Sequence, residues 1–198
     1  MTYEIVSQNY TVTSAAATDA VTIADVKRYL RLDTSDENPQ MLALIPAATN
    51  FLQNLLSRQF VTATYAQYFN AVPSNPAELF LAVAPVSSIT SVAYVDDDGD
   101  TQTWSSSSYQ TDLVSEPAKI KPAWGESWPT IRQQYAAITV TYVAGYGAQS
   151  AVPKDIKQTI ALLVSHWYEN REPVGKGSEL PFSLQSMINS LRWNPVIS

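Results

Sequence analysis

The sequence predicts an α+β fold, in which about four helices form a small helical bundle and an antiparallel β module is inserted between helices two and three. Two observations carry this prediction. Residues 22–60 and 153–193 place apolar side chains at helical spacing. Residues 61–150 instead consist of short β-like runs with turn signals every 8–12 residues or so. We therefore interpret residues 1–198 as a single domain whose β module interrupts one helical core.

The N-terminal part leads into the first helix. Residues 1–21 are polar and rich in Thr and Ala, which favours an extended arm or a short strand. Thr22 can cap the helix that follows, because Asp25 stands three residues later in the capping-box position. The apolar face of this helix is predicted to consist of Ile23, Val26 and Leu30.

The second helix begins at Asn38, a suitable N-cap, with Pro39 at the first helical position. Pro46 inside it has no N–H for the Leu42 carbonyl, a loss of about 3 kcal/mol in a helix interior, so a kink or a restart is expected there. Its buried stripe is predicted to be Leu42, Ile45, Thr49, Leu52 and Leu56.

The β module contains seven candidate strands, and the last shows the clearest alternation. There, Ile138, Val140 and Tyr142 face one side, and the residues between them face the other. The pattern is typical of a small antiparallel sheet or a barrel-like module. The seven runs are TATYAQYFN, ELFLAV, SITSVAYVD, TQTW, YQTDLV, AKIKPA and AAITVTYVAGYG.

Two helices follow the β module. The first occupies residues 153–172 and stops before Pro173, with an apolar stripe of Ile156, Ile160, Leu163, Val164 and Trp167. After a loop rich in Gly and Pro, Ser183 is predicted to cap a last helix over residues 183–193. The apolar face of that helix comprises Leu184, Met187, Ile188 and Leu191.

The composition excludes several classes of function. Charged residues make up 15% of the chain, against about 25% in ordinary soluble proteins, and the net charge is −6 without a basic stripe. Tight non-specific nucleic-acid binding is therefore not expected. The absence of cysteine excludes disulfides, thiolate nucleophiles and cysteine zinc sites. Neither a signal peptide nor an apolar run of roughly 18 residues is evident, so we expect a soluble chain without a membrane span.

The single histidine, His166, is the first candidate for chemistry, in the stretch SHWYENREPV. Its neighbour Ser165 lies about 100° away around the helix axis, and no G-x-S-x-G motif supplies a nucleophile. A hydrogen bond to Glu169 or Asn170 would be ordinary helix-surface chemistry. We therefore expect neither a catalytic role nor a metal site, and interpret His166 as an exposed or interface residue.

The acidic run VDDDGD resembles a calcium loop only superficially. If Gly99 is aligned to position six, Tyr94 and Ser105 occupy positions one and twelve, where acidic ligands belong. Asp-Gly between two alternating runs instead predicts a β-hairpin turn. A weak divalent-cation site at Asp96–Asp100 is the alternative.

The stretch GESWPTIRQQ places Trp128 near Arg132, a pairing that could bind a phosphate or a sugar. The favoured interpretation is a loop that its tryptophans pack onto the sheet. The glycines of VAGYG lack the spacing of a phosphate-binding loop, so they are interpreted as a strand end and a turn. No cofactor site is predicted.

Several segments, taken in order, are similar to the head–tail connector (adaptor) family of tailed bacteriophages, which has relatives in gene transfer agents. They include VTIADVKRYLRLD, LLSRQF, SVAYVDDDGDTQTW, YVAGYG followed by a VP and an IK, HWYENRE and LPFSLQSMINSLR. The resemblance covers about residues 20–193. Pro46 departs from the small residues usual in the second helix of that family.

The resemblance implies a structural protein of the particle neck that assembles in the host cytoplasm. About twelve copies would form a ring beneath the portal protein, extend the channel for double-stranded DNA without reading its sequence, and offer a surface to a stopper or other tail-side protein. It also implies portal docking by the last helix, through Leu184, Met187, Ile188, Leu191 and Trp193.

The candidates for contacts between neighbours in the ring are His166, Tyr168, Arg171, Trp128 and Arg132. An alternative function is a soluble carbohydrate-binding β module that uses Trp104, Trp124 and Trp128. A small hydrolase is the third hypothesis, and it lacks a nucleophile–base pair.

Overall fold

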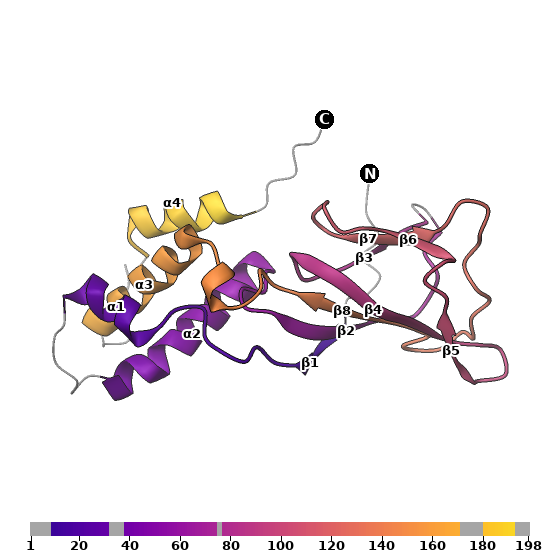
Figure 1. Cartoon of the computed structure of the whole chain (residues 1–198), viewed down its shortest axis with the longest axis horizontal. Helices are drawn as coiled ribbons and strands as arrows, with labels where there is room; N and C mark the ends of the chain where they lie inside the picture. Colours follow the sequence, from indigo (N-terminus) through magenta and orange to yellow (C-terminus); the bar gives the residue numbers. More distant parts are fainter. Residues whose placement is uncertain (1–8, 32–37, 75–76, 171–179, 193–198) are drawn as a thin grey trace. The chain divides into compact units, whose positions relative to one another are not determined.

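The computed structural model describes residues 9–31, 38–74, 77–170 and 180–192. The chain forms two compact units (Figure 1). The β unit comprises residues 1–16 and 62–145, and the helical unit comprises residues 17–61 and 146–198. The predicted α+β class, with an antiparallel β module between helices two and three, is confirmed.

Four α-helices build the described part of the helical unit, with α3 in contact with each of the other three. The predicted capping box is present: Thr22 Oγ1 accepts a hydrogen bond from the Asp25 N–H at 3.1 Å, and the Asp25 carboxylate accepts one from the Thr22 N–H. The elements are α1 (Ile23–Leu30), α2 (Asn38–Leu56), a 3-10 turn (Gln149–Ala151), α3 (Lys154–Glu169) and α4 (Phe182–Leu191).

The structure corrects three details of the predicted helices. Leu42 is 59% exposed, because it lies just outside the buried arc of α2 that Met41 begins. Pro46 causes no restart, because α2 is one helix that continues through it. Ser183 is not a cap, because α4 begins one residue earlier, without a capping side chain.

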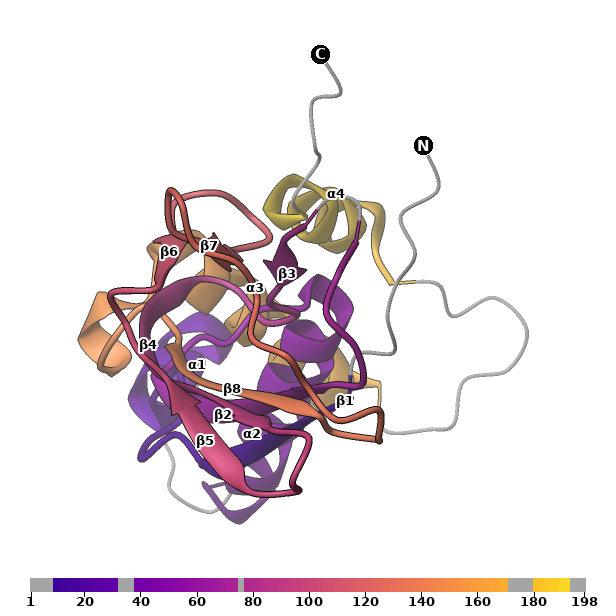
Figure 2. The ribbon, with the colours of Figure 1, turned by 90° about the vertical axis from the view of Figure 1, so that its right-hand side faces the viewer.

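Two antiparallel sheets form the β unit. The larger has the strand order β1-β2-β8-β4-β5 and the smaller the order β3-β7-β6. Figure 2 shows the smaller sheet lying over the larger one. All seven predicted strand runs are confirmed, and the predicted arm contributes an additional strand, β1. The strands are β1 (Asn9–Ser14), β2 (Ala63–Phe69), β3 (Leu79–Phe80), β4 (Val86–Val95), β5 (Thr101–Trp104), β6 (Tyr109–Asp112), β7 (Lys119–Pro122) and β8 (Ile138–Ala144).

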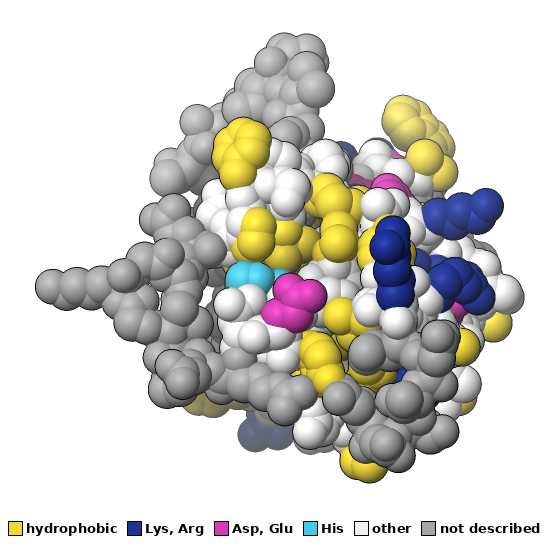
Figure 3. Space-filling view, turned by 90° about the vertical axis from the view of Figure 1, so that its left-hand side faces the viewer, with side chains coloured by type: hydrophobic (Ala, Val, Ile, Leu, Met, Phe, Trp, Pro, Cys, Tyr) yellow, Lys and Arg dark blue, Asp and Glu magenta, His cyan; other side chains and the backbone are white. Residues whose placement is uncertain are grey.

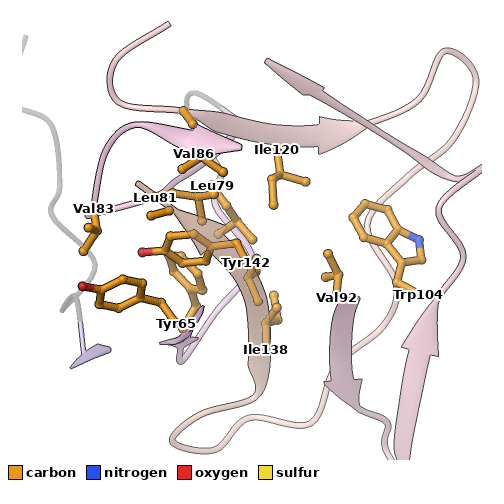
Figure 4. Close-up of a cluster of buried hydrophobic side chains, with 14 of the residues drawn as sticks. Tyr65, Leu79, Leu81, Val83, Val86, Val92, Trp104, Ile120, Ile138 and Tyr142 are labelled. Carbon is orange, nitrogen blue, oxygen red and sulfur yellow. The ribbon is translucent and has the colours of Figure 1, made fainter. Parts of the chain in front are cut away.

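The core of the β unit lies between the two sheets (Figure 4). In β8 the predicted alternation is confirmed: Ile138, Val140 and Tyr142 are each at most 1% exposed, and the residues between them are half-buried. Tyr65 on β2 stacks on Tyr142 with ring centroids 5.8 Å apart. Ile120 of the smaller sheet packs against the same cluster.

One polar side chain crosses this core. Gln67 on β2 is fully buried, yet its amide is satisfied. Nε2 donates to the Phe80 carbonyl at 3.1 Å, and Oε1 accepts from the Ala82 N–H at 2.9 Å and from the Tyr142 hydroxyl at 3.3 Å. Gln67 therefore joins the larger sheet to the segment around β3.

Candidate interaction surfaces

The C-terminal turn of α3 holds His166 in an ordinary helix-end environment. The Asn170 side-chain amide lies 3.2 Å from His166 Nδ1 and donates to the His166 carbonyl at 2.8 Å. The predicted contact with the residue at i+4 is therefore confirmed. His166 itself is half-buried, as is Tyr168, so each presents part of its side chain to the surface.

An apolar patch lies beside this helix end, and we define it as Phe51, Leu55 and Trp167. Phe51 and Leu55, on successive turns of α2, are 40% and 36% exposed. Trp167 meets Phe51 edge-on, with ring centroids 5.8 Å apart. Figure 3 shows hydrophobic side chains next to the single histidine on this face. The apolar stripe of α3 therefore ends at a surface patch. The α2 residues of this patch, Phe51 and Leu55, were not predicted from the sequence.

Helix α4 buries two of the residues on its predicted docking face. Leu184 and Ile188 are each 3% exposed, so they belong to the interior of the helical unit and are not free for a partner in this conformation. Met187 and Leu191 are half-buried. Phe182, which the sequence did not single out, is 84% exposed. Of the other predicted contact residues, Arg171 and Trp193 lie outside the described residues.

In the β unit, Trp128 packs onto the sheet as predicted. The Trp128 ring lies 4.8 Å from that of Trp104, which in turn lies 5.2 Å from the ring of Tyr109. The Trp128 indole N–H donates to the Ala77 carbonyl at 3.3 Å. Trp104 is only 8% exposed, so its ring is not available to stack on a sugar, whereas Trp124 is fully exposed.

The acidic run forms the predicted hairpin turn between β4 and β5. Gly99 has φ +96° and donates to the Asp96 carbonyl, and the Asp96 carboxylate accepts hydrogen bonds from the Asp100 N–H and the Gln102 amide. These bonds lower the pKa of Asp96. The guanidinium of the exposed Arg132 lies over the turn, 2.5 Å from where a Cβ on Gly99 would be.

The described ranges contain no group of three His, Asp or Glu side chains that could hold a metal ion. No helix in the same ranges is long and apolar enough to cross a membrane.

The predicted contact residues are therefore divided between the two units. His166 and Tyr168 lie on the helical unit, whereas Trp128 and Arg132 lie on the β unit. Sequence reasoning missed the exposed apolar residues of strand β1, Tyr10 and Val12, which are 44% and 52% exposed. The alternation in NYTVTS was the signal that could have found them.

Comparison with known proteins decides the family. The model of the head completion protein family matches residues 19–177, which is most of the chain. The chain belongs to the head completion protein family. The connector resemblance inferred from the sequence is thereby confirmed.

Solved structures share the fold of this head completion protein over nearly its whole length. A chain from the neck of an empty GTA particle, computed with C6 symmetry, has a TM-score of 0.77 at 21% identity, covering 96% of this chain and 98% of that one. A chain from the virion of the native gene transfer agent (GTA) gives 0.74 at 21% identity, with 96% and 97% covered. One from the neck of the native GTA particle, computed with C12 symmetry, gives 0.72 at 19% identity, with 96% and 98% covered. Curated protein sequences provide no match.

Proposed function

We propose that this head completion protein is a non-catalytic structural component of a phage or gene-transfer-agent neck. About twelve copies form a ring under the portal protein, extend the DNA channel and present the attachment surface for a stopper or another tail-side protein. The family match over residues 19–177 carries the proposal. The fold similarity to chains of particle necks solved with C6 and C12 symmetry supports it.

Neighbouring copies in such a ring meet through two different surfaces, because a closed ring of more than two copies needs a heterologous contact. The helical unit supplies one candidate surface, formed by the apolar patch together with His166 and Tyr168. The β unit supplies Trp128 and Arg132. Arg171 is kept as a candidate on sequence grounds alone.

Portal docking is assigned to the C-terminal helix and the residues that follow it. The structure narrows the candidates on α4, since Leu184 and Ile188 are buried. Met187, Leu191 and the exposed Phe182 keep accessible surface, and Trp193 extends the set by sequence. An apolar helix face of this size suits insertion into a groove on the partner.

The distribution of charge fits a channel through which DNA slides. The β unit carries nine acidic and three basic residues and the helical unit nine of each, so the whole net charge of −6 belongs to the β unit. An acidic channel wall repels phosphates and keeps DNA from sticking. A ring whose lumen proves to be basic would contradict this part of the proposal.

The test combines the chain with its portal protein and counts the copies by native mass spectrometry and electron microscopy. We expect a ring of about twelve copies on the portal. Leu191→Asp should abolish docking, whereas Asn189→Asp on the exposed side of α4 should not, with helical content unchanged in both. A chain that stays monomeric in the presence of the portal refutes the proposed function.

A further inference from the structure

Strand β1 is an open edge of the larger sheet. It pairs with β2 on one side, and within the described ranges no strand pairs with its other side. Its sequence, NYTVTS, contains neither a charge nor a proline, the two usual devices that keep an edge strand from pairing with another chain. Its outward N–H and C=O groups are therefore available to a further strand.

The core-facing side of the sheet is also left uncovered at β1. Val12 stands opposite Tyr65, which stands opposite Tyr142, so these side chains share the face that the smaller sheet covers elsewhere. Exposure rises along this row: Tyr142 is fully buried, Tyr65 is 6% exposed and Val12 is 52% exposed. Tyr10 continues the aromatic row, edge-on to Tyr65 at 5.8 Å. An apolar face that extends past its cover indicates that something else covers it.

Strand β5 is the opposite edge of the same sheet. It pairs with β4 alone among the described strands, and its sequence, TQTW, is likewise free of charge and proline. Three of its four residues, Thr101, Gln102 and Thr103, are exposed. One β unit therefore carries two uncharged open edges, one at each end of the same sheet.

We propose that β1 of one copy pairs with β5 of the next copy, so that the larger sheets of neighbouring copies join edge to edge around the ring. The inference rests on the ring of the proposed function and assigns the main-chain contact that holds it. The pairing is heterologous, as a ring requires, and it uses both open edges of every copy. It brings the neighbour's strand beside Tyr10 and Val12 and extends the cover over them.

The charges and the symmetry favour this pairing over the two alternatives. A β5–β5 contact would be isologous and would stop at a dimer; if its strands were parallel, it would also bring together two copies of the acidic turn that precedes β5, with Asp97, Asp98 and Asp100 exposed in each. A β1–β1 contact would be isologous, so it would stop at a dimer and leave β5 unpaired. The uncharged β1 is the edge of this chain that meets β5 without repulsion.

Cysteine cross-linking tests the pairing directly, because the chain contains no cysteine of its own. Gln102→Cys is combined with Val12→Cys in one variant and with Tyr10→Cys in another, so that two registers are sampled on one face of the sheet. Within one copy, three strands separate β1 from β5, a distance of about 19 Å, whereas a disulfide needs Cα atoms closer than about 7 Å. Any disulfide therefore joins two copies.

Particles assembled with each variant as the only copy are oxidised and analysed on a non-reducing gel, and the ring is imaged separately. We expect a ladder from dimer up to the full ring, which collapses to monomer on reduction. A ring without cross-links in either variant overturns the β1–β5 pairing and leaves the proposed function standing. Particles assembled with the unsubstituted chain that lack the ring altogether overturn both. Single-cysteine Val12→Cys controls should stay monomeric, since a dimer there would reveal a β1–β1 contact and overturn the inference.

A charge placed on the edge gives an independent readout. Val12→Lys should reduce incorporation into particles at least tenfold, because the lysine would have to be buried beside the neighbour's strand. The matched control is Val114→Lys, an identical change at a loop position of the β unit that is 95% exposed. Equal incorporation of both variants contradicts the inference, provided that circular dichroism shows both to be folded.

Discussion

The buried amide of Gln67 allows a sharp test of how the β unit is held together. In Gln67→Leu a similar volume remains, but three hydrogen bonds, to Phe80, Ala82 and Tyr142, are lost at once. Each such bond contributes about 0.5–1.5 kcal/mol net, and the partners are left without a replacement. After a gain of about 1 kcal/mol from the added apolar burial, we expect the free energy of unfolding to fall by about 2–3 kcal/mol.

The measurement is urea unfolding followed by tryptophan fluorescence, because Trp104 and Trp128 pack within the β unit. Gln110→Leu is the matched control: this exposed glutamine on β6 makes a single 3.3 Å hydrogen bond to the Pro122 carbonyl. It should change stability by no more than about 0.5 kcal/mol. A loss below about 0.5 kcal/mol in Gln67→Leu would refute the idea that the amide holds the two sheets together.

A double-mutant cycle with Tyr142→Phe separates the contributions. The Tyr142 hydroxyl donates to Gln67 and accepts a hydrogen bond from the Val83 N–H. If Gln67 and Tyr142 act as one network, the double variant should lose less stability than the sum of the two single losses, by about 0.5–1 kcal/mol. Strict additivity would show that the two side chains stabilise the core independently.

Three further predictions concern other parts of the chain. Burial raises the pKa of Tyr65 to about 12 from an unfolded value of 10.0, so the unfolded chain loses this proton first as the pH rises. The free energy of unfolding should therefore fall between pH 10 and 12 by about 1.4 kcal/mol per pH unit. Urea unfolding midpoints measured over this range should fall less steeply in Tyr65→Phe than in the unsubstituted chain. Leu184→Ala should lower the free energy of unfolding in urea by about 2–4 kcal/mol, because the Leu184 side chain is buried. Phe182→Ala, at a position that is 84% exposed, should change it by no more than about 0.5 kcal/mol. Equal losses in the two variants would place α4 outside the core. Gly99→Ala should lower the melting temperature through its positive φ, at a cost of about 1–2 kcal/mol, and part of that loss should disappear in an Arg132→Ala background, where the guanidinium no longer opposes the new methyl group.

Local patterns in the sequence were enough to predict most elements. The capping box of Thr22 and Asp25, the alternation around Val140 and the Asp-Gly turn at Gly99 all reflect interactions within a few residues of the chain. Such interactions are encoded in sequence spacing, so they can be recognised without knowing the tertiary fold.

What escaped prediction depends on contacts between distant segments. The rotation of α2 about its axis, which buries Met41 and exposes Leu42, is set by packing against α3. Hydropathy alone could not separate two adjacent apolar residues at the edge of a stripe. The pairing of β1 with β2 joins segments about fifty residues apart, and a short polar strand gives no signal of its partner.

The candidate contact residues divide in the same way, into those that local sequence could place and those whose position depends on contacts between distant segments. The packing of Trp128 on the sheet was predicted correctly, because the large apolar surface of an indole next to strands of alternating pattern is best buried against the sheet. The docking role of α4 stays a prediction, since one apolar stripe can serve the core of its own chain or a partner equally well. Only the burial of Leu184 and Ile188 separates the two uses.

The order of strands in the larger sheet has a kinetic consequence. Strands β4 and β5 are joined by a tight turn and can pair early, whereas β1 reaches β2 only after a loop of about fifty residues, which includes α1 and α2, has closed. We expect the amides of β1 to exchange with solvent faster than those of β8 in the isolated chain. The strand that docks last during folding is thus also the one that a neighbour could lock, so assembly itself would complete the fold.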